Sequence, residues 1–310
     1  MEKDTNFWNI LELANKFQDK KVCHQYLLSQ RCGDQINCPH CKCTKIYNFT
    51  DGIRYKCSKC RKIFTATTGT IFEGTKIPLQ KWFIAIYLCT THKKGISSIQ
   101  LGKDLGITQK AAWHLLHRIR EGLVEKAPEM LEGVIEVDET YVGGKSKNKH
   151  YNKRKKGQQG RGGTEKTPVF GMLQRNGKIR TMKVPDVKRA TLQPLIYKHV
   201  ESGSVIMSDE WFAYKGLSRF YDHYEVNHGA YQYVDGDIYT NTLEGAWSHL
   251  KRSIIGVYHQ VSRKHMDRYC AEFDFRYNTR HIDGNMRMQL MLSQCQGRLK
   301  YKDLIKKEAA

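Results

Sequence analysis

Residues 133–145 read GVIEVDETYVGGK, and this stretch decides which fold the second half of the chain can adopt. Its β-branched residues predict a strand over 134–142 that ends at Gly143-Gly144. Asp138 lies within this apolar strand. A carboxylate in such a place is costly to desolvate unless it is paired or binds a metal ion. The stretch therefore predicts a buried strand that carries a functional acid.

Two further acids stand at comparable positions along the chain. Asp209 closes the short strand predicted over 204–208, and Glu244 falls in the first turn of a predicted helix 35 residues later. Two such strands side by side, with the helix laid across them, would gather three carboxylates around two Mg²⁺ or Mn²⁺ ions roughly 4 Å apart. That arrangement activates a water or a 3′-hydroxyl for phosphodiester transfer.

Each of these acids also has a structural interpretation. Asp138 could cap the turn that follows its strand, and Glu136, on the same strand face, could then be the functional acid instead. Asp209 could be the N-cap of a helix. Glu244 together with Asn241 resembles a capping box, which would make both residues structural.

The other segments of this half alternate between strand and helix patterns. Residues 168–185 predict a hairpin that turns at Asn176-Gly177, 191–200 a helix, 224–239 a further strand region and 241–280 helical structure. Between the first strand and the hairpin, residues 145–166 hold nine Lys or Arg, four Gly and one acid. This composition predicts a solvated basic loop. Its candidate DNA-binding residues are Lys153, Arg154, Lys155 and Lys156.

Cysteines organise the first part of the chain. Six of the ten cysteines fall within 32–60, and two CxxC pairs there are separated by fifteen residues. Two such pairs bring four thiolates around one structural Zn²⁺ in a zinc ribbon. A metal-free or redox role is the alternative, and His40 and Cys43 are close enough to compete as ligands. The expected ligands are Cys38, Cys41, Cys57 and Cys60.

The charge of the chain points to a polyanionic partner. Lys and Arg number 52 against 31 Asp and Glu, which gives a formal net charge of +21. An excess of this size favours nucleic acid as the partner, although a solvated basic surface would also account for it. Within 36–66, seven Lys or Arg face a single Asp, with aromatic residues between them. The ribbon is therefore a candidate for contact with DNA phosphates, or else a purely structural zinc module.

Helical patterns surround the ribbon. Two short helices are predicted over 9–28 and a buried helix over 79–89. A helix-turn-helix follows, with a first helix over 97–105 that ends at Gly106 and a second that begins at Thr108 as N-cap. A purely structural helical hairpin is the alternative interpretation. The polar face of the second helix is a candidate surface for a DNA groove, formed by Lys110, Trp113, His114, His117 and Arg118.

Composition excludes several classes of protein. With 40% hydrophobic and 27% charged residues, the chain is neither disordered nor fibrous. Its apolar runs are far shorter than the roughly 20 residues that a membrane-spanning helix needs, and no signal sequence follows Met1. We expect a protein without a membrane partner, located in the cytoplasm and associated with the nucleoid, or in the nucleus if the source is eukaryotic.

Several motifs in the same order resemble one family. The motifs are 133–145 (GVIEVDETYVGGK), 207–217 (MSDEWFAYKGL), 241–252 (NTLEGAWSHLKR), 256–262 (GVYHQVS), 264–265 and 273–280 (FDFRYNTR). They resemble the zinc-ribbon insertion-sequence transposases with an ISXO2-like DDE catalytic domain, which are related to the eukaryotic Merlin transposases. The resemblance covers nearly the whole chain. It implies a ribonuclease H-like catalytic fold with a mixed five-stranded sheet and helices on both faces, and cleavage or transfer of element ends with Mg²⁺.

The resemblance also assigns roles to single residues. The first catalytic aspartate of the family falls on Asp138 and the second on Asp209. The third position falls on Glu244 or Asn241, one helical turn apart, and Glu244 is favoured because a carboxylate holds Mg²⁺ better than an amide. Lys251 returns to the same helix face and could hold a phosphate. The apolar stripe of this helix is interpreted as core only: Leu243, Trp247, Leu250 and Ile254.

The sequence therefore predicts an α+β multidomain protein. The expected domains are N-terminal helices over 1–35, a zinc ribbon over 36–68, a helix-turn-helix region over 69–127, a ribonuclease H-like DDE domain over 128–285 and a helical tail over 286–310. The expected function is that of a DNA transposase that binds terminal inverted repeats and target DNA as a homodimer or higher oligomer, and catalyses metal-dependent cleavage and strand transfer. The alternatives are a DNA-binding regulator derived from a transposase and a metal-dependent nuclease without transfer activity.

Overall fold

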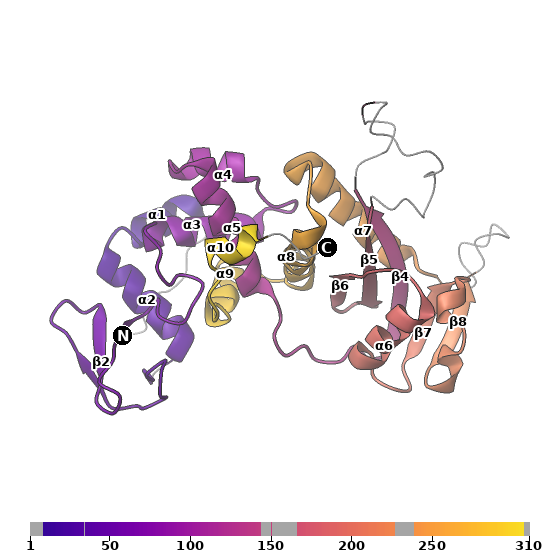
Figure 1. Ribbon diagram of the computed structural model, residues 1–310, viewed down its shortest axis with the longest axis horizontal. Coiled ribbons are helices and arrows are strands. Elements are labelled where there is room, and N and C mark those ends of the chain that lie inside the picture. The colour runs from indigo at the N-terminus through magenta and orange to yellow at the C-terminus, as the bar shows by residue number, and fades with distance from the viewer. Residues whose placement is uncertain (1–8, 34, 144–149, 151–165, 227–238, 307–310) are drawn as a thin grey trace. The chain divides into compact units, whose positions relative to one another are not determined.

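The computed structural model describes residues 9–33, 35–143, 150, 166–226 and 239–306 (Figure 1). The chain forms two compact units, one from Met1–Val124 together with Thr279–Ala310 and the other from Glu125–Asn278. Within the described ranges, no helix is long and apolar enough to cross a membrane.

The first unit is mainly helical. Its helices are α1 (Ile10–Lys16), α2 (Lys20–Cys32), α3 (Leu79–Thr91), α4 (Ser98–Leu105), α5 (Gln109–Leu123), α9 (Gly284–Ser293) and α10 (Tyr301–Ile305). The predicted pair around Gly106 corresponds to α4 and α5. Gly106 has a φ of 59°, the left-handed conformation that ends a helix, and the Thr108 hydroxyl accepts the Ala111 N–H at 3.3 Å as the N-cap of α5.

The ribbon in this unit is a three-stranded antiparallel sheet. Its strands are β1 (Ile46–Asn48), β2 (Arg54–Cys57) and β3 (Ile63–Thr65), in the order β1-β2-β3. Tyr55 and Phe64 face each other across β2 and β3 with ring centroids 5.7 Å apart. This small apolar contact leaves most of the other side chains of the ribbon in contact with solvent.

The C-terminal helices belong to the first unit rather than to a separate tail. The sequence placed a domain boundary at residue 285, whereas along the chain the second unit ends at Asn278 and the first resumes at Thr279. Helix α9 packs on α2 and α3, and its Met288 is fully buried. The Arg287 guanidinium also donates to the Thr90 carbonyl at 3.0 Å. The tail completes the core of the first unit because its apolar residues fill the face that α3 presents.

The second unit is built on a mixed five-stranded sheet. Its strands are β4 (Val134–Val142), β5 (Thr167–Gln174), β6 (Ile179–Lys183), β7 (Val205–Asp209) and β8 (Asp222–Val226). The order is β6-β5-β4-β7-β8, with β6, β5 and β4 antiparallel and β4, β7 and β8 parallel. This order and these directions are those of a ribonuclease H-like sheet, so the predicted fold class is confirmed.

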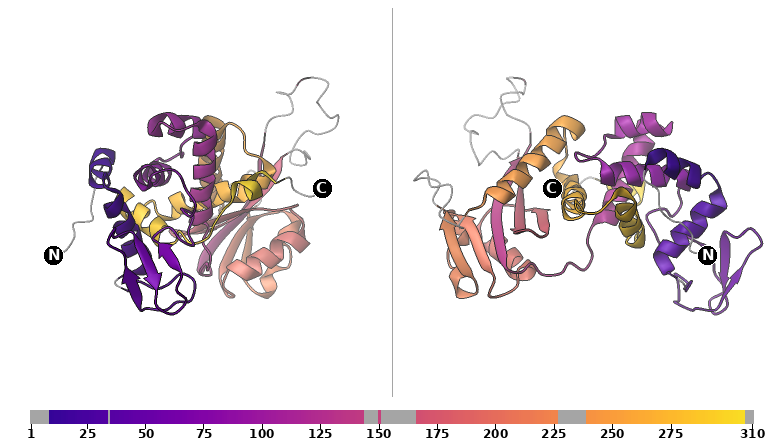
Figure 2. Two further views of the ribbon diagram at one scale, coloured as in Figure 1. Left: turned by 60° about the vertical axis from the view of Figure 1, so that its left-hand side comes forward. Right: turned by 180° about the vertical axis from the view of Figure 1, so that it is seen from behind.

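Helices cover both faces of this sheet (Figures 1 and 2). Helix α6 (Arg189–His199) packs on one face, over a core that includes Ile135, Phe170 and Ile206. Helices α7 (Asn241–Ser253) and α8 (Met266–Asn278) pack on the other face. Short 3-10 turns at Phe212–Tyr214, Leu217–Arg219 and Arg263–His265 and a π turn at Ile254–Tyr258 join these elements.

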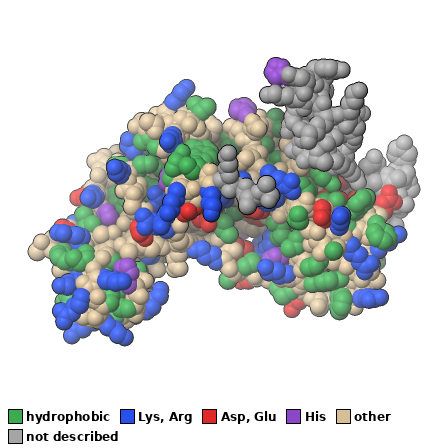
Figure 3. Space-filling model, viewed as in Figure 1, with side chains coloured by type: hydrophobic (Ala, Val, Ile, Leu, Met, Phe, Trp, Pro, Cys, Tyr) green, Lys and Arg blue, Asp and Glu red, His purple; other side chains and the backbone are tan. Residues whose placement is uncertain are grey.

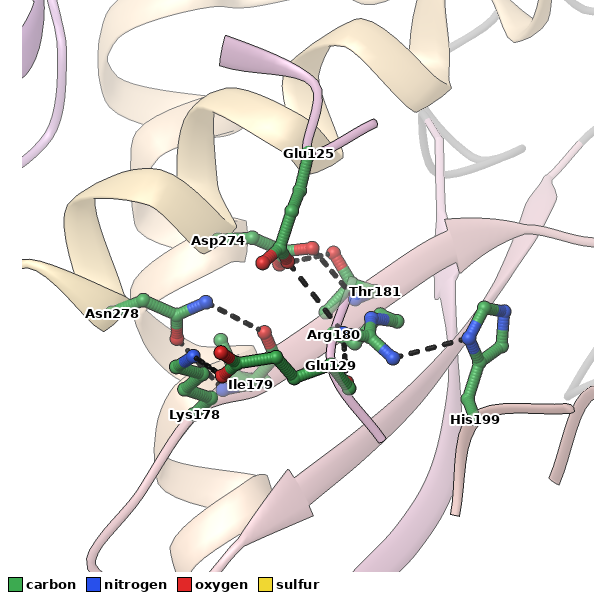
Figure 4. A network of polar contacts seen from close by, with 9 residues as sticks. All are labelled: Glu125, Glu129, Lys178, Ile179, Arg180, Thr181, His199, Asp274 and Asn278. Atoms are coloured by element: carbon green, nitrogen blue, oxygen red, sulfur yellow. Dashed lines mark hydrogen bonds and ion pairs between the residues drawn. The ribbon is translucent and has the colours of Figure 1, made fainter. Parts of the chain in front are cut away.

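Three side chains of α8 satisfy the outer edge of β6 (Figure 4 shows two of them). The backbone N–H groups of Ile179, Thr181 and Lys183 donate to Asn278 at 2.7 Å, Asp274 at 2.8 Å and Asp267 at 2.8 Å. These three residues alternate along the strand, so their N–H groups point to the same side. An uncovered edge strand is a template for pairing with another chain, and here the helix occupies it. The motif 273–280 contains two of the three helix residues.

Candidate active site and zinc centre

The two aspartates predicted to bind metal lie on neighbouring parallel strands. The register of β4 and β7 pairs Val134 with Val205 and Glu136 with Met207. The same register carried two residues further, beyond the last paired residues, would bring Asp138 level with Asp209. Both are an even number of residues from a paired position, so both point to the sheet face that α7 covers. The two carboxylates therefore lie on one face of neighbouring strands, close enough for the charge of Asp209 to act on Asp138.

The environment of Asp138 raises its pKa to about 7. Burial is the main cause, and the negative charges of Glu139 and, more weakly, Asp209 act in the same direction. A hydrogen bond from the Trp247 indole to Oδ2 of Asp138, at 2.8 Å, opposes them. Two neighbouring carboxylates of which one is partly desolvated attract a cation, because the cation offsets both their repulsion and the cost of burial.

Trp247 has a role that its place in the apolar stripe of α7 did not predict. Its ring packs on β5 at Gly171, which pairs with Asp138 across the strands. A Cβ at Gly171 would lie 2.4 Å from the Trp247 ring, so only glycine lets the indole come this close to the sheet. One general signal was available, because a buried Trp usually finds an acceptor for its N–H.

Glu136, the alternative to Asp138, is fully buried and serves another purpose. Its Oε1 accepts the Arg175 Nε–H at 3.0 Å, and its Oε2 accepts the Leu243 backbone N–H at 2.9 Å. Arg175 lies over the Tyr239 ring at 3.6 Å and donates to the Tyr239 carbonyl at 2.8 Å. Glu136 thus anchors the first turn of α7 to the sheet, which positions the rest of that helix.

The third candidate position remains apart from the aspartates. Glu244 and Asn241 are both exposed in the first turn of α7, and Lys251 is exposed in its last turn. Among the described acids, histidines and cysteines, Asp138, Asp209 and Glu244 do not form a group with converging ligand atoms. The capping-box interpretation is not supported either, since the N-cap is Thr240 and the Leu243 N–H goes to Glu136.

Two hydrogen bonds fix the segment that follows Asp209. The Tyr214 hydroxyl, which is fully buried, donates to Glu139 at 2.7 Å. The Trp211 N–H donates to Oδ1 of Asp209 at 3.1 Å, an Asx turn at the end of β7. The chain that leaves Asp209 is therefore held against β4.

The four cysteines of the two CxxC pairs form a site that fits Zn²⁺. Their sulfur atoms all lie within 4.8 Å of one another, with Cys38 and Cys60 at 3.6 Å and Cys41 and Cys57 at 3.5 Å. Tetrahedral Zn²⁺ with bonds of about 2.3 Å separates its sulfurs by roughly 3.8 Å. The competing candidates stay outside this group, and Cys43 lies beside the Ser58 hydroxyl instead.

The polar face of α5 is not the open recognition surface that the sequence predicted. His117 is fully buried and Arg118 is 6% exposed, so the prediction that these two face a DNA groove is wrong. Lys110 is exposed, and Trp113 and His114 are partly buried. The physical reason is that other segments cover the face: the Tyr301 ring of α10 lies 5.3 Å from His114, and Arg118 donates to the Glu73 carbonyl at 2.8 Å. The loop candidates Lys153, Arg154, Lys155 and Lys156 lie outside the described residues.

The ribbon does present a basic surface. Lys and Arg side chains gather over it, at the lower left of the space-filling view (Figure 3). Its exposed cations are Lys42, Lys45, Arg54, Lys59, Arg61 and Lys62. Asp51 is the acid within the ribbon, and it is paired with Arg54 at 2.6 Å.

Comparisons with known proteins agree with this geometry. Residues 130–278 match the ISXO2-like transposase domain, and residues 18–63 match the transposase zinc-ribbon domain. A protein of the transposable element ISH50 from Halobacterium salinarum is 30% identical over 264 residues, which cover 81% of this chain and 88% of that protein. This chain belongs to the ISXO2-like transposase family. The transposase has its paired aspartates inside the first match and its four cysteines inside the second.

Two more distant similarities were found. A transposase-like protein of Haemophilus influenzae is 28% identical to the transposase over 106 residues, or 34% of this chain and 85% of that protein. The crystal structure of a pre-cleavage Mos1 transpososome is similar over 65% of this chain and 73% of that chain, at 13% identity and a TM-score of 0.24.

Proposed function

We propose that the transposase cleaves DNA at the ends of its insertion sequence and joins those ends to target DNA. Two Mg²⁺ or Mn²⁺ ions would be held by Asp138 and Asp209, with Glu244 as the third ligand and Asn241 as the alternative. The observation that carries this proposal is that Asp138 and Asp209 lie on the same face of the neighbouring parallel strands β4 and β7, with Asp138 partly desolvated and under the influence of the Asp209 charge.

The donor set fits this chemistry. Mg²⁺ prefers oxygen ligands, and Asp138 and Asp209 would supply two carboxylates to hold it. When bound, such ions supply an activated nucleophile and stabilise the leaving oxygen. The chain's own part is positioning: Trp247 orients the Asp138 carboxylate, and Glu136 with Arg175 fixes the start of α7. Lys251, at the far end of α7, would hold a phosphate of the DNA.

Binding of DNA would come chiefly from basic surfaces. The exposed cations of the ribbon suit the phosphate backbone, and Zn²⁺ would hold the ribbon in shape. The basic stretch 145–166 adds nine Lys or Arg close in sequence to Asp138. The two DNA ends of an element call for two copies of the chain, so we propose a homodimer or higher oligomer on DNA, acting in the nucleoid.

The proposal is tested by following one labelled terminal-repeat duplex and one unlabelled target duplex with Mg²⁺. We expect binding, cleavage at the end and a longer joined product. Binding without cleavage would contradict the proposal and favour the regulator. Cleavage without a joined product would contradict the transfer step and favour the nuclease. The control is Glu201→Gln, an exposed acid after α6, which should behave like the wild type.

A further inference from the structure

Arg118 of α5 is a buried cation that forms no ion pair with any acid in the described part of the chain. Its side chain is 6% exposed, and its Nη2 donates a hydrogen bond to the Glu73 carbonyl at 2.8 Å. Its Nε–H is buried and has no acceptor among the described residues. A buried guanidinium normally has its charge paired and its donors satisfied.

The carboxylate of Glu73, whose charge acts on Arg118, is already engaged elsewhere. The Glu73 carboxylate accepts from Arg298 at 2.7 Å and from the Gly69 N–H at 2.9 Å. Arg118 therefore meets the carbonyl of Glu73 and not its charge. Arg298 also adds a second positive charge nearby, which together with burial lowers the pKa of Arg118 to about 10.

A cavity of about 140 Å³ lies beside the Arg118 side chain. Its walls include the segment Gly74, Thr75 and Lys76 and, from α5, His114. Nε2 of His114 is buried and has no partner among the described residues, and Lys76 is exposed at the rim. None of the residues that line the cavity is acidic. Three basic residues, Lys76, His114 and Arg118, thus line one space.

We propose that this cavity binds one phosphate group, held by the Arg118 guanidinium, the Lys76 ammonium and the His114 imidazole. Arginine suits this role because its planar fork donates two parallel hydrogen bonds to phosphate oxygens. The Trp82 ring beneath the guanidinium, at 5.0 Å, keeps the fork in place. The phosphate is either that of a DNA backbone or a free phosphate. The first possibility rests on the proposed function and makes the cavity an anchor that sets the register of the first unit on the DNA, without reading bases.

The first arm of the test uses inorganic phosphate alone. Thermal unfolding of the full chain is followed in phosphate and in chloride at equal ionic strength. We expect phosphate to raise the Tm of the wild type, because a ligand that binds only the folded state stabilises it. Arg118→Gln and Lys76→Met should lose this rise. Lys93→Met, which removes an exposed charge of the same unit away from the cavity, should keep it.

The second arm uses a short DNA duplex and measures affinity against salt. If a DNA phosphate occupies the cavity, Arg118→Gln and Lys76→Met should each lower the log–log slope by about 0.9, the value for one phosphate contact. An unchanged slope with a lost phosphate effect would assign the cavity to free phosphate. The variant Arg118→Lys should recover the slope only in part, because it keeps the charge and loses the fork.

The proposal is overturned if phosphate stabilises the wild type no more than chloride does and both variants keep the wild-type slope. Lys76 is exposed, so its variant stays informative even if Arg118→Gln fails to fold. A wild type that binds no DNA would contradict the proposed function but leave the first arm to decide the cavity. The two failures are therefore distinguishable.

Discussion

Trp247 and Gly171 together determine how the Asp138 carboxylate is oriented. The indole reaches Oδ2 of Asp138 because β5 carries no side chain at the contact point. The place of Asp138 in a buried strand was predictable, since an aspartate in an apolar run of sequence is conspicuous. Its two supporting residues were not, because one looked like any core aromatic and the other like any strand glycine. Their roles depend on the pairing of β4 with β5, which no local pattern encodes.

At the residue scale, Trp247→Phe should impair catalysis more than folding. The change keeps most of the buried ring and removes the N–H, so one acceptor on Asp138 loses its donor at a cost of about 1–3 kcal/mol. Groups that orient metal ligands typically contribute 10- to 100-fold, and we expect Mg²⁺-dependent nicking to fall by roughly that factor. Leu250→Val, a core change on the same helix, should lose some stability and keep its nicking rate. Equal nicking by Trp247→Phe and wild type would refute this positioning role.

At the element scale, α8 acts as a substitute for a neighbouring strand of β6. Helical spacing predicted a helix in this region, and the hairpin turn at Asn176-Gly177 predicted β6. The hydrogen bonds between α8 and β6 were not predictable, because they depend on β6 being an edge strand. In these bonds alternate backbone N–H groups of β6 donate to Asp267, Asp274 and Asn278. Polar residues on a helix otherwise indicate a solvated face.

Asp274 should make the stability of the second unit depend on pH. Burial raises its pKa from 3.8 to about 8, so its ionised form is disfavoured in the folded state. Its contribution to stability is therefore complete below about pH 4 and is lost as the pH rises through 8. Asp274→Asn should remove this loss. The free energy of unfolding of the variant, measured relative to that of the wild type, should therefore be a few kcal/mol higher above pH 8 than at pH 5. Urea unfolding across this pH range measures it.

The control for this prediction is Thr181→Val. It removes the hydroxyl that donates to Asp274 at 2.7 Å and keeps the titrating carboxyl. We expect lower stability overall with the wild-type loss on raising the pH still present. Parallel pH curves for Asp274→Asn and the wild type would contradict the assignment.

The ribbon is a second element for which we predict the main source of stability, the bound metal ion. Its three short strands bury little apolar surface, so the metal should supply most of its folding free energy. Cys57→Ser should lose bound zinc and the ordered ribbon. Cys43→Ser, outside the group of four sulfurs, should retain both. Elemental analysis and proteolysis of the ribbon measure this, and a zinc content unchanged by Cys57→Ser would be evidence against the site.

At the scale of the whole molecule, the order of the modules was predictable. The packing of the C-terminal helices onto the first unit was not. The ribbon and the α4–α5 pair follow from local spacing, and the mixed sheet was expected from the family resemblance. The packing of α9 on α3 joins residues nearly two hundred positions apart, as the contact of Arg287 with Thr90 illustrates. The same long-range packing brings α10 beside α5, which is why the polar face of α5 was misinterpreted as open.

Removing a buried side chain of α9 should therefore destabilise the first unit. Met288 is fully buried, and Met288→Ala should cost about 2–5 kcal/mol. Met286, on the same helix, is 49% exposed, and Met286→Ala should change stability by less than about 0.5 kcal/mol. Chemical unfolding compares the two. Equal stability of the two variants would show that the C-terminal helices are a separate tail.

The central claim is that Asp138 and Asp209 are metal ligands at a DNA-cleaving site, and Mg²⁺-dependent nicking of a labelled DNA end by Asp138→Asn tests it most directly. The substitution keeps the shape of the side chain and removes its charge, which Mg²⁺ requires. We predict a loss of at least 10- to 100-fold in nicking with unchanged DNA binding. The same assay on Glu244→Gln and Asn241→Ala identifies the third ligand as the one whose loss abolishes nicking. Full activity of Asp138→Asn would contradict the catalytic assignment.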